Sequence, residues 1–89
     1  MSKYILHSVY TTKLDTATGA FASEQSESIV FEKNEKLGKI FVTKIWGDDT
    51  SDQNLEEYAN QGHGKWMSVE AARAEYSKCI RSGYIAIND

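Results

Sequence analysis

The stretch that decides the fold is Trp66-Met-Ser-Val-Glu-Ala-Ala-Arg-Ala-Glu-Tyr-Ser-Lys-Cys-Ile-Arg-Ser-Gly-Tyr-Ile-Ala-Ile87. Ser68 is a suitable N-cap, because its hydroxyl can accept hydrogen bonds from the free backbone N–H groups of a first helical turn. Apolar residues then recur at three- and four-residue spacing, and Gly83 suits the left-handed residue that ends a helix. The sequence therefore predicts a helix over residues 69–82, followed by a short apolar strand. The apolar face of this helix is expected to hold Val69, Ala72, Tyr76 and Ile80, with Glu75 outside.

Two strands are predicted at the start of the chain. Residues 4–14 are rich in β-branched and aromatic side chains, which favours a strand. Turn-forming residues follow at Asp15–Gly19 and predict a hairpin that returns over residues 21–32. The polar segment Ser23–Ser28 is unsuited to the centre of a buried sheet, so we expect an exposed edge, a bulge or a mobile arm there.

A third strand is predicted over residues 39–46, after a turn at 34–38. Ile40, Val42 and Trp46 share one parity of this strand. We expect Trp46 to lie inside the protein, and Tyr58 to be the most exposed of Trp46, Tyr58 and Trp66. The predicted order is thus β-β-β-loop-α-β. This is a single α+β domain over residues 1–89: a small antiparallel sheet of three or four strands with one principal C-terminal helix packed on one face.

Composition limits the classes of function. The net charge is −3, whereas nucleic-acid binders usually carry a basic excess, so nucleic acid is not the expected partner. Cys79 is the only cysteine, which excludes an internal disulfide and favours a reducing, cytoplasmic setting. The chain opens without a charged-then-apolar leader, and its apolar runs fall short of the roughly 18 residues that a membrane span needs.

The segment from Asp48 to Lys65 is polar, long and expected to be irregular, apart from a short helical turn at residues 55–59 capped by Ser51 or Asp52. Five carboxylates occur within residues 48–57. A calcium loop starting at Asp48 would need glycine at its sixth position and glutamate at its twelfth, but these are Gln53 and Ala59. We therefore predict an acidic contact surface and no metal site.

A glycine-containing segment, Gly62-His-Gly-Lys65, precedes the predicted helix. Glycine allows close backbone approach to a ligand, and helix N-terminal amides attract anions. A Walker A loop would require Ser or Thr after the lysine, and this position holds Trp66. A small-anion site remains as one hypothesis. His7, His63 and Cys79 are too scattered to predict a catalytic set, so neither an enzyme nor a cofactor is expected.

The order of a strand, Trp46-Gly47, a loop, and then the helix that ends in Gly83-Tyr84 resembles the WGR domain of poly(ADP-ribose) polymerases and of some bacterial regulators. The resemblance covers roughly half of the chain and implies contact with nucleic acid. Asp48 stands where the family has the arginine of its motif.

The sequence favours a non-enzymatic, acidic protein-interaction module: a small regulator, an inhibitor such as one encoded by a phage, or an accessory subunit of a larger complex. A WGR-like nucleic-acid-binding module and a small-anion-binding domain that uses residues 62–65 are the alternatives. A protein partner with a basic surface is expected, and a homodimer through a sheet edge is the rival contact. The predicted contact residues are Asp48, Asp49, Asp52, Glu56, Glu57, Tyr58, His63, Lys65 and Trp66.

Overall fold

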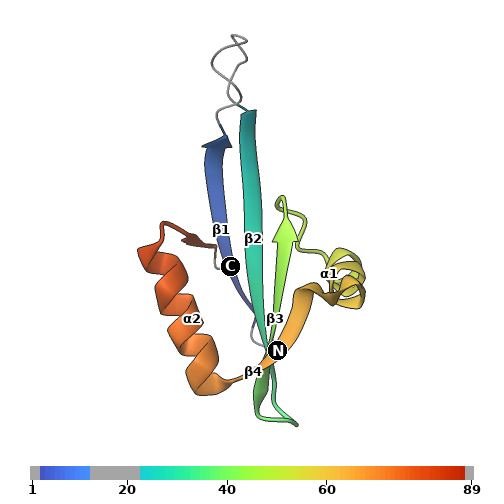
Figure 1. The fold of residues 1–89 in the computed structure, drawn as a ribbon. Coiled ribbons are helices and arrows are strands. Elements are labelled where there is room, and N and C mark those ends of the chain that lie inside the picture. The colour runs from blue at the N-terminus through green and yellow to red at the C-terminus, as the bar shows by residue number, and fades with distance from the viewer. Residues whose placement is uncertain (1–2, 13–22, 88–89) are drawn as a thin grey trace.

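Within the part of the chain that the structure describes, five antiparallel strands form one sheet (Figure 1). The structure is a computed structural model that describes residues 3–12 and 23–87. The strands are β1 (Lys3–Thr12), β2 (Ser23–Asn34), β3 (Lys39–Trp46), β4 (Gly64–Ser68) and β5 (Ile85–Ile87), in the spatial order β4-β3-β2-β1-β5. The helices are α1 (Asp52–Tyr58), which continues into a π-helical turn (Ala59–His63), and α2 (Val69–Arg81).

The predicted α+β class is confirmed, as is the principal C-terminal helix. The sheet has five strands because Gly64–Ser68, which was not predicted to be a strand, pairs with β3. The predicted turn at Asp15–Gly19 lies outside the described residues.

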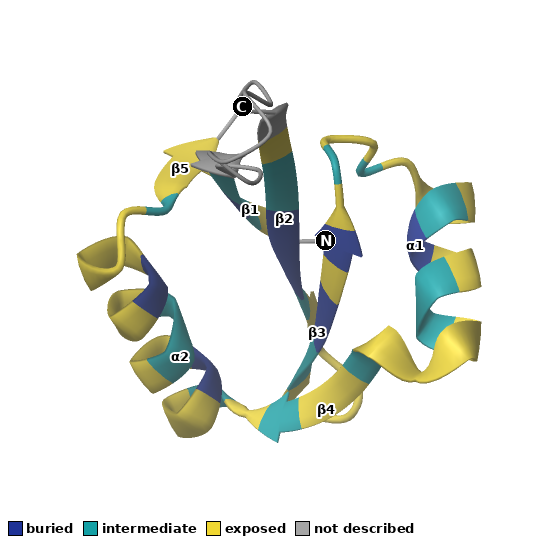
Figure 2. Cartoon of the chain, turned by 45° about the horizontal axis from the view of Figure 1, so that its top comes forward, coloured by how far each residue is buried: buried dark blue, intermediate teal, exposed yellow. Residues whose placement is uncertain are grey.

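The two helices cover opposite faces of the sheet. Alternation along β2 turns Ile29 and Phe31 toward α2, where they pack with Ala72 and Cys79. The intervening Val30 faces the other side and packs with Ile45 of β3 and Leu55 of α1. Figure 2 shows the buried faces of both helices turned toward the sheet between them. Each face of β2 therefore contributes to a separate apolar cluster.

β2 is the middle strand of the sheet from Glu27 onward, and, of the described strands, residues 23–26 pair with β1 alone. The expected edge is therefore found at residues 23–26, whereas the expected bulge in Ser23–Ser28 is wrong. The segment pairs in continuous register with β1. Ser28 is buried, and its hydroxyl donates to the Gly47 carbonyl at 2.8 Å and lies 2.9 Å from Nδ1 of His7. These partners remove the penalty of burying a polar group. Pairing with β3 begins only at Glu27, so the far ends of β1 and β2 form a two-stranded ribbon (Figure 1).

The capping and the end of α2 agree with the prediction. The Ser68 hydroxyl accepts from the backbone N–H of Ala71 at 3.1 Å, and Gly83 has φ 104° just after the helix. Ala72 is buried and Tyr76 packs against the same cluster, as expected.

The positions of Ile80 and Glu75 were predicted wrongly. Ile80 is 42% exposed, whereas the neighbouring Cys79 is 5% exposed. Glu75 lies half-buried, with its carboxylate 3.9 Å from the Cys79 thiol. The helix thus presents Ala72, Glu75, Tyr76 and Cys79 toward the sheet, and one residue further along, at Ile80, the side chain has rotated by about 100° away from it.

Candidate protein-interaction site

The segment 48–65 is mostly regular structure, so the prediction of a long irregular loop is wrong. The Ser51 hydroxyl accepts from the Asn54 backbone N–H at 3.4 Å and caps α1, which confirms one of the two predicted caps. Asp49 supports this helix start, because its carboxylate accepts from the Ser51 N–H and its carbonyl from the Asn54 side chain. Burial of Leu55 then holds the helix on the sheet.

Asp52 is tied to the first strand. Its carboxylate accepts a hydrogen bond from the Lys3 ammonium at 2.8 Å, and Lys3 also lies 3.9 Å from Glu32. The Lys3 hydrogen bond holds the pKa of Asp52 below its usual value. Because the Asp52 side chain is exposed, this pair orients α1 more than it stabilises the fold.

The aromatic residues at this end of the molecule differ in exposure from the prediction. Trp46, expected inside, is 61% exposed, because it lies opposite Glu27 at the end of β3 and outside both apolar clusters. Tyr58, expected to be the most exposed, packs on the cluster of Val30, Ile45 and Leu55. Its ring lies 5.5 Å from that of His63.

Trp66 is the aromatic residue that combines exposure with a fixed position. It is 47% exposed, and its ring packs edge-on against Phe41 with the centroids 4.9 Å apart. The two residues are directly opposite each other on β4 and β3. A Cβ atom at Gly64 would overlap the Phe41 ring, so the glycine allows the ring to lie there.

Phe41 and Trp66 border an open cleft of about 770 Å³ between α1 and the β2–β3 hairpin. Apolar side chains line part of it: Val30, Phe41, Leu55, Ala59 and Trp66. Charged side chains line the rest: Glu32, Lys33, Glu35, Lys36, Asp52 and Glu56. The cleft therefore combines apolar and charged surface, with carboxylates from both α1 and the hairpin and lysines from the hairpin alone.

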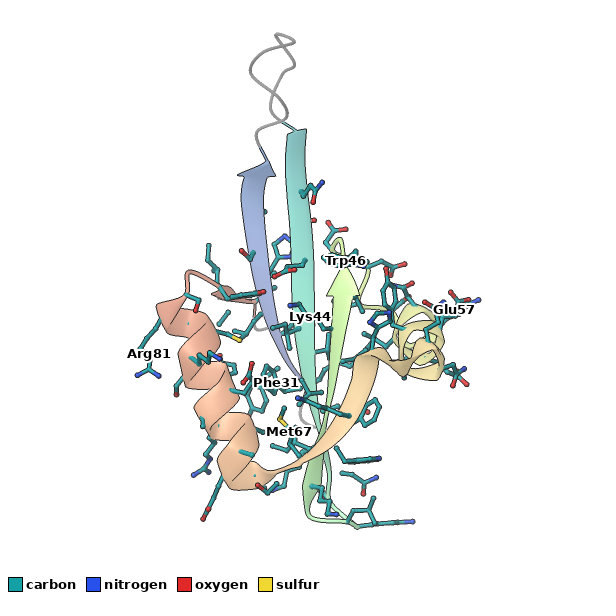
Figure 3. All side chains as sticks on the ribbon, viewed as in Figure 1. Phe31, Lys44, Trp46, Glu57, Met67 and Arg81 are labelled. Carbon is teal, nitrogen blue, oxygen red and sulfur yellow. The ribbon has the colours of Figure 1, made fainter. Side chains whose placement is uncertain are left out.

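The structure brings only part of the predicted contact residues together. Asp52, Glu56 and Trp66 line the cleft. His63 and Lys65 line a second, smaller pocket on the α2 side of the sheet. The remaining residues line neither pocket: Asp48, Asp49, Glu57 and Tyr58. Glu57 points away from the sheet (Figure 3).

Sequence reasoning missed the hairpin wall of the cleft and Phe41. The alternation of β3 could have placed Phe41 on the α1 side of the sheet, because Phe41 is adjacent to Val42 and so lies on the opposite face. Without the position of β4, however, the alternation does not show that Trp66 would lie beside it.

The described residues offer little for metal or thiol chemistry. They include no group of three or more His, Cys, Asp and Glu side chains that could hold a metal ion. Burial raises the pKa of the Cys79 thiol, which keeps it in its unreactive protonated form. None of the described helices is long and apolar enough to cross a membrane.

Comparisons with known proteins return nothing: no protein-family model matches the chain, and no curated protein or solved structure matches it. A proposal about function therefore depends on the geometry of the cleft and of the smaller pocket.

Proposed function

We propose that this chain is a non-enzymatic protein-interaction module that binds a basic segment of a partner protein in the cleft between α1 and the β2–β3 hairpin. A cytoplasmic regulator, inhibitor or accessory subunit is the role that this proposal implies. The observation that carries it is the half-exposed Trp66 ring, held against Phe41 in an open, partly apolar cleft.

The apolar part of the cleft supports an anchoring contact. Tryptophan is enriched among the residues that contribute most of the binding energy at protein interfaces. Trp66 is already ordered by Phe41 on the neighbouring strand, so little side-chain entropy would be lost when a partner covers it. An apolar side chain of the partner could then contact Trp66 and Leu55.

The charges around α1 support a basic partner. Residues 48–58 carry five carboxylates and no lysine or arginine. Lys3 neutralises Asp52 in part, whereas the described residues provide no ion pair for Glu56, which lines the cleft. A partner cation is therefore expected on the α1 side of the cleft, where complementary charge would speed association.

Peptide selection tests this proposal directly. Random peptides displayed on phage would be selected on the full chain, and synthetic copies of the enriched peptides titrated into the Trp46→Phe variant, in which Trp66 is the only tryptophan. We expect enriched peptides to combine lysine or arginine with an apolar residue and to shift the Trp66 emission. Trp66→Ala should weaken their binding by about tenfold or more.

Two matched controls separate the cleft from the rest of the surface. Trp46→Ala removes another exposed tryptophan outside the cleft and should leave the Kd within about twofold. Glu56→Lys should slow association more than Glu57→Lys, because Glu56 lines the cleft and Glu57 does not. Peptides that lack basic residues, or that bind the Trp66→Ala variant as tightly as the parent, would overturn the proposal.

A further inference from the structure

A second pocket, of about 170 Å³, lies between α2 and the β3–β4 part of the sheet. Its lining includes two lysines from different strands, Lys44 of β3 and Lys65 of β4. The register places them on one face, because Lys65 pairs with Val42, two residues before Lys44. His63, just before β4, also lines the pocket. Two cationic groups that are distant in the sequence thus converge on one pocket.

The lysines are only loosely engaged. The ammonium of Lys44 lies 4.0 Å from the Glu27 carboxylate, and its side chain is half-exposed. Among the described residues no ion pair holds Lys65. Both ammonium groups are therefore able to turn toward an anion without breaking a close ion pair.

The rest of the pocket is apolar, apart from one carboxylate. Ile29 and Val42 are buried members of the α2-side cluster, and Met67 packs against it. Figure 3 shows Met67 between α2 and the sheet. Glu75 of α2 also lines this pocket. A ligand here would meet positive charge from the strands, apolar surface from the sheet and negative charge from the helix.

We propose that this pocket binds a small organic carboxylate with a short apolar chain. The carboxylate would be held by Lys44 and Lys65, and the chain would lie mainly against the partly exposed Met67, with Ile29 and Val42 forming the floor of the pocket. This site is independent of the protein-binding cleft, which lies on the opposite face of the sheet. The backbone amides at the N-terminus of α2, which were expected to attract the anion, do not contribute to this site. Strand β4 separates residues 62–63 from the helix, and the Ser68 side chain caps the helix.

An NMR titration of the ¹⁵N-labelled full chain with 3-methylbutanoate tests the proposal. We expect saturable shifts of the amide signals of Gly62, Gly64 and Met67. Lys44→Gln and Lys65→Gln should each weaken the affinity by about threefold or more, the size expected for loss of an exposed charge pair. Lys39→Gln is the matched control, because it removes an exposed lysine outside this pocket, and it should leave the affinity unchanged.

Two further arms make the test specific. Glu75→Gln should strengthen carboxylate binding, because it removes the negative charge that opposes the ligand. Inorganic phosphate should bind more weakly than 3-methylbutanoate, because it lacks the apolar chain. The proposal fails if the shifts do not saturate, if phosphate binds at least as tightly, or if the Lys44→Gln and Lys65→Gln variants bind like the parent.

Discussion

At the residue scale, the two positions Ile45 and Ile80 show how burial differs for the same side chain. Ile45 is 1% exposed in the cluster beneath α1, whereas Ile80 is 42% exposed on α2. Truncating a buried isoleucine to alanine costs about 2–5 kcal/mol, because transfer energy is lost and a cavity remains. We expect Ile45→Ala to lower the free energy of unfolding by this amount.

The matched variant Ile80→Ala should lower the free energy of unfolding by about 1 kcal/mol or less, because Ile80 is a surface residue with only some apolar contact. Urea unfolding followed by circular dichroism measures both values. A larger loss at Ile80 than at Ile45 would show that α2 presents a different face to the sheet.

The thiol of Cys79 should make stability depend on pH. Burial raises its pKa in the folded state. Above the unfolded-state pKa of about 8.5, the unfolded chain therefore binds fewer protons than the folded chain, and stability falls as pH rises. The stability that the protonated Cys79 thiol contributes is fully present below the unfolded-state pKa and is lost as pH rises through the folded-state pKa.

Urea unfolding under reducing conditions, from about pH 7 to about pH 9.5, tests this expectation. Cys79→Ala removes the titrating group and should be less stable than the parent at neutral pH, because it leaves a small cavity. The difference in unfolding free energy between the parent and this variant should narrow as pH rises. A constant difference would show that burial of the thiol has no linked effect.

At the element scale, α2 could be predicted from sequence, and β4 could not. The helix depends on local signals: the Ser68 cap, the three- and four-residue spacing, and Gly83 at its end. The strand at Gly64–Ser68 depends on pairing with β3, more than 20 residues away along the chain. A short segment that contains a glycine and a lysine carries little strand signal of its own.

The candidate site was predictable only in part for the same reason. The acidic composition pointed to Asp52 and Glu56, and both line the cleft. The opposite wall comes from the β2–β3 hairpin, and the Phe41–Trp66 contact joins strands separated by α1. Ser28 shows the reverse error, since its polarity argued against a central strand until Gly47 and His7 supplied partners.

The N-cap of α2 provides the prediction for this scale. Ser68→Ala removes the hydroxyl that accepts from the Ala71 N–H and should lower the free energy of unfolding by about 1 kcal/mol. Ser77→Ala is the control, because Ser77 is an exposed residue within the same helix and alanine has the higher helix propensity. Thermal unfolding of both variants would measure the loss of stability in Ser68→Ala relative to Ser77→Ala. Equal stability of the two variants would show that the cap contributes nothing.

At the scale of the whole molecule, charge is divided between the two sides of the sheet. The outer surface of α2 exposes three cations, Arg73, Lys78 and Arg81, and one carboxylate, Glu70, whereas α1 exposes Glu56 and Glu57. Figure 3 shows Arg81 and Glu57 pointing outward on opposite sides of the molecule. On the α1 side the lysines of the β2–β3 hairpin, such as Lys33 and Lys36, lie among carboxylates, so the α2 side is where a nucleic acid would meet the least repulsion.

This division leads to the last prediction, that no tight complex with DNA or RNA forms at physiological salt. Five cations on the α2 side, Lys44 and Lys65 beside the smaller pocket and Arg73, Lys78 and Arg81 on α2, would neutralise at most about five phosphates, which limits the slope of log K against log salt to about −4.5. The net charge of −3 opposes even this contact.

Fluorescence anisotropy of a labelled DNA duplex and a labelled RNA, measured over a range of salt concentrations, gives both the affinity and the slope. Any weak binding at low salt should become weaker in the double variant Arg73→Gln, Arg81→Gln, which removes two of these cations. A complex that persists at physiological salt and is indifferent to these changes would instead favour the WGR-like nucleic-acid-binding alternative, with a contact surface elsewhere on the molecule.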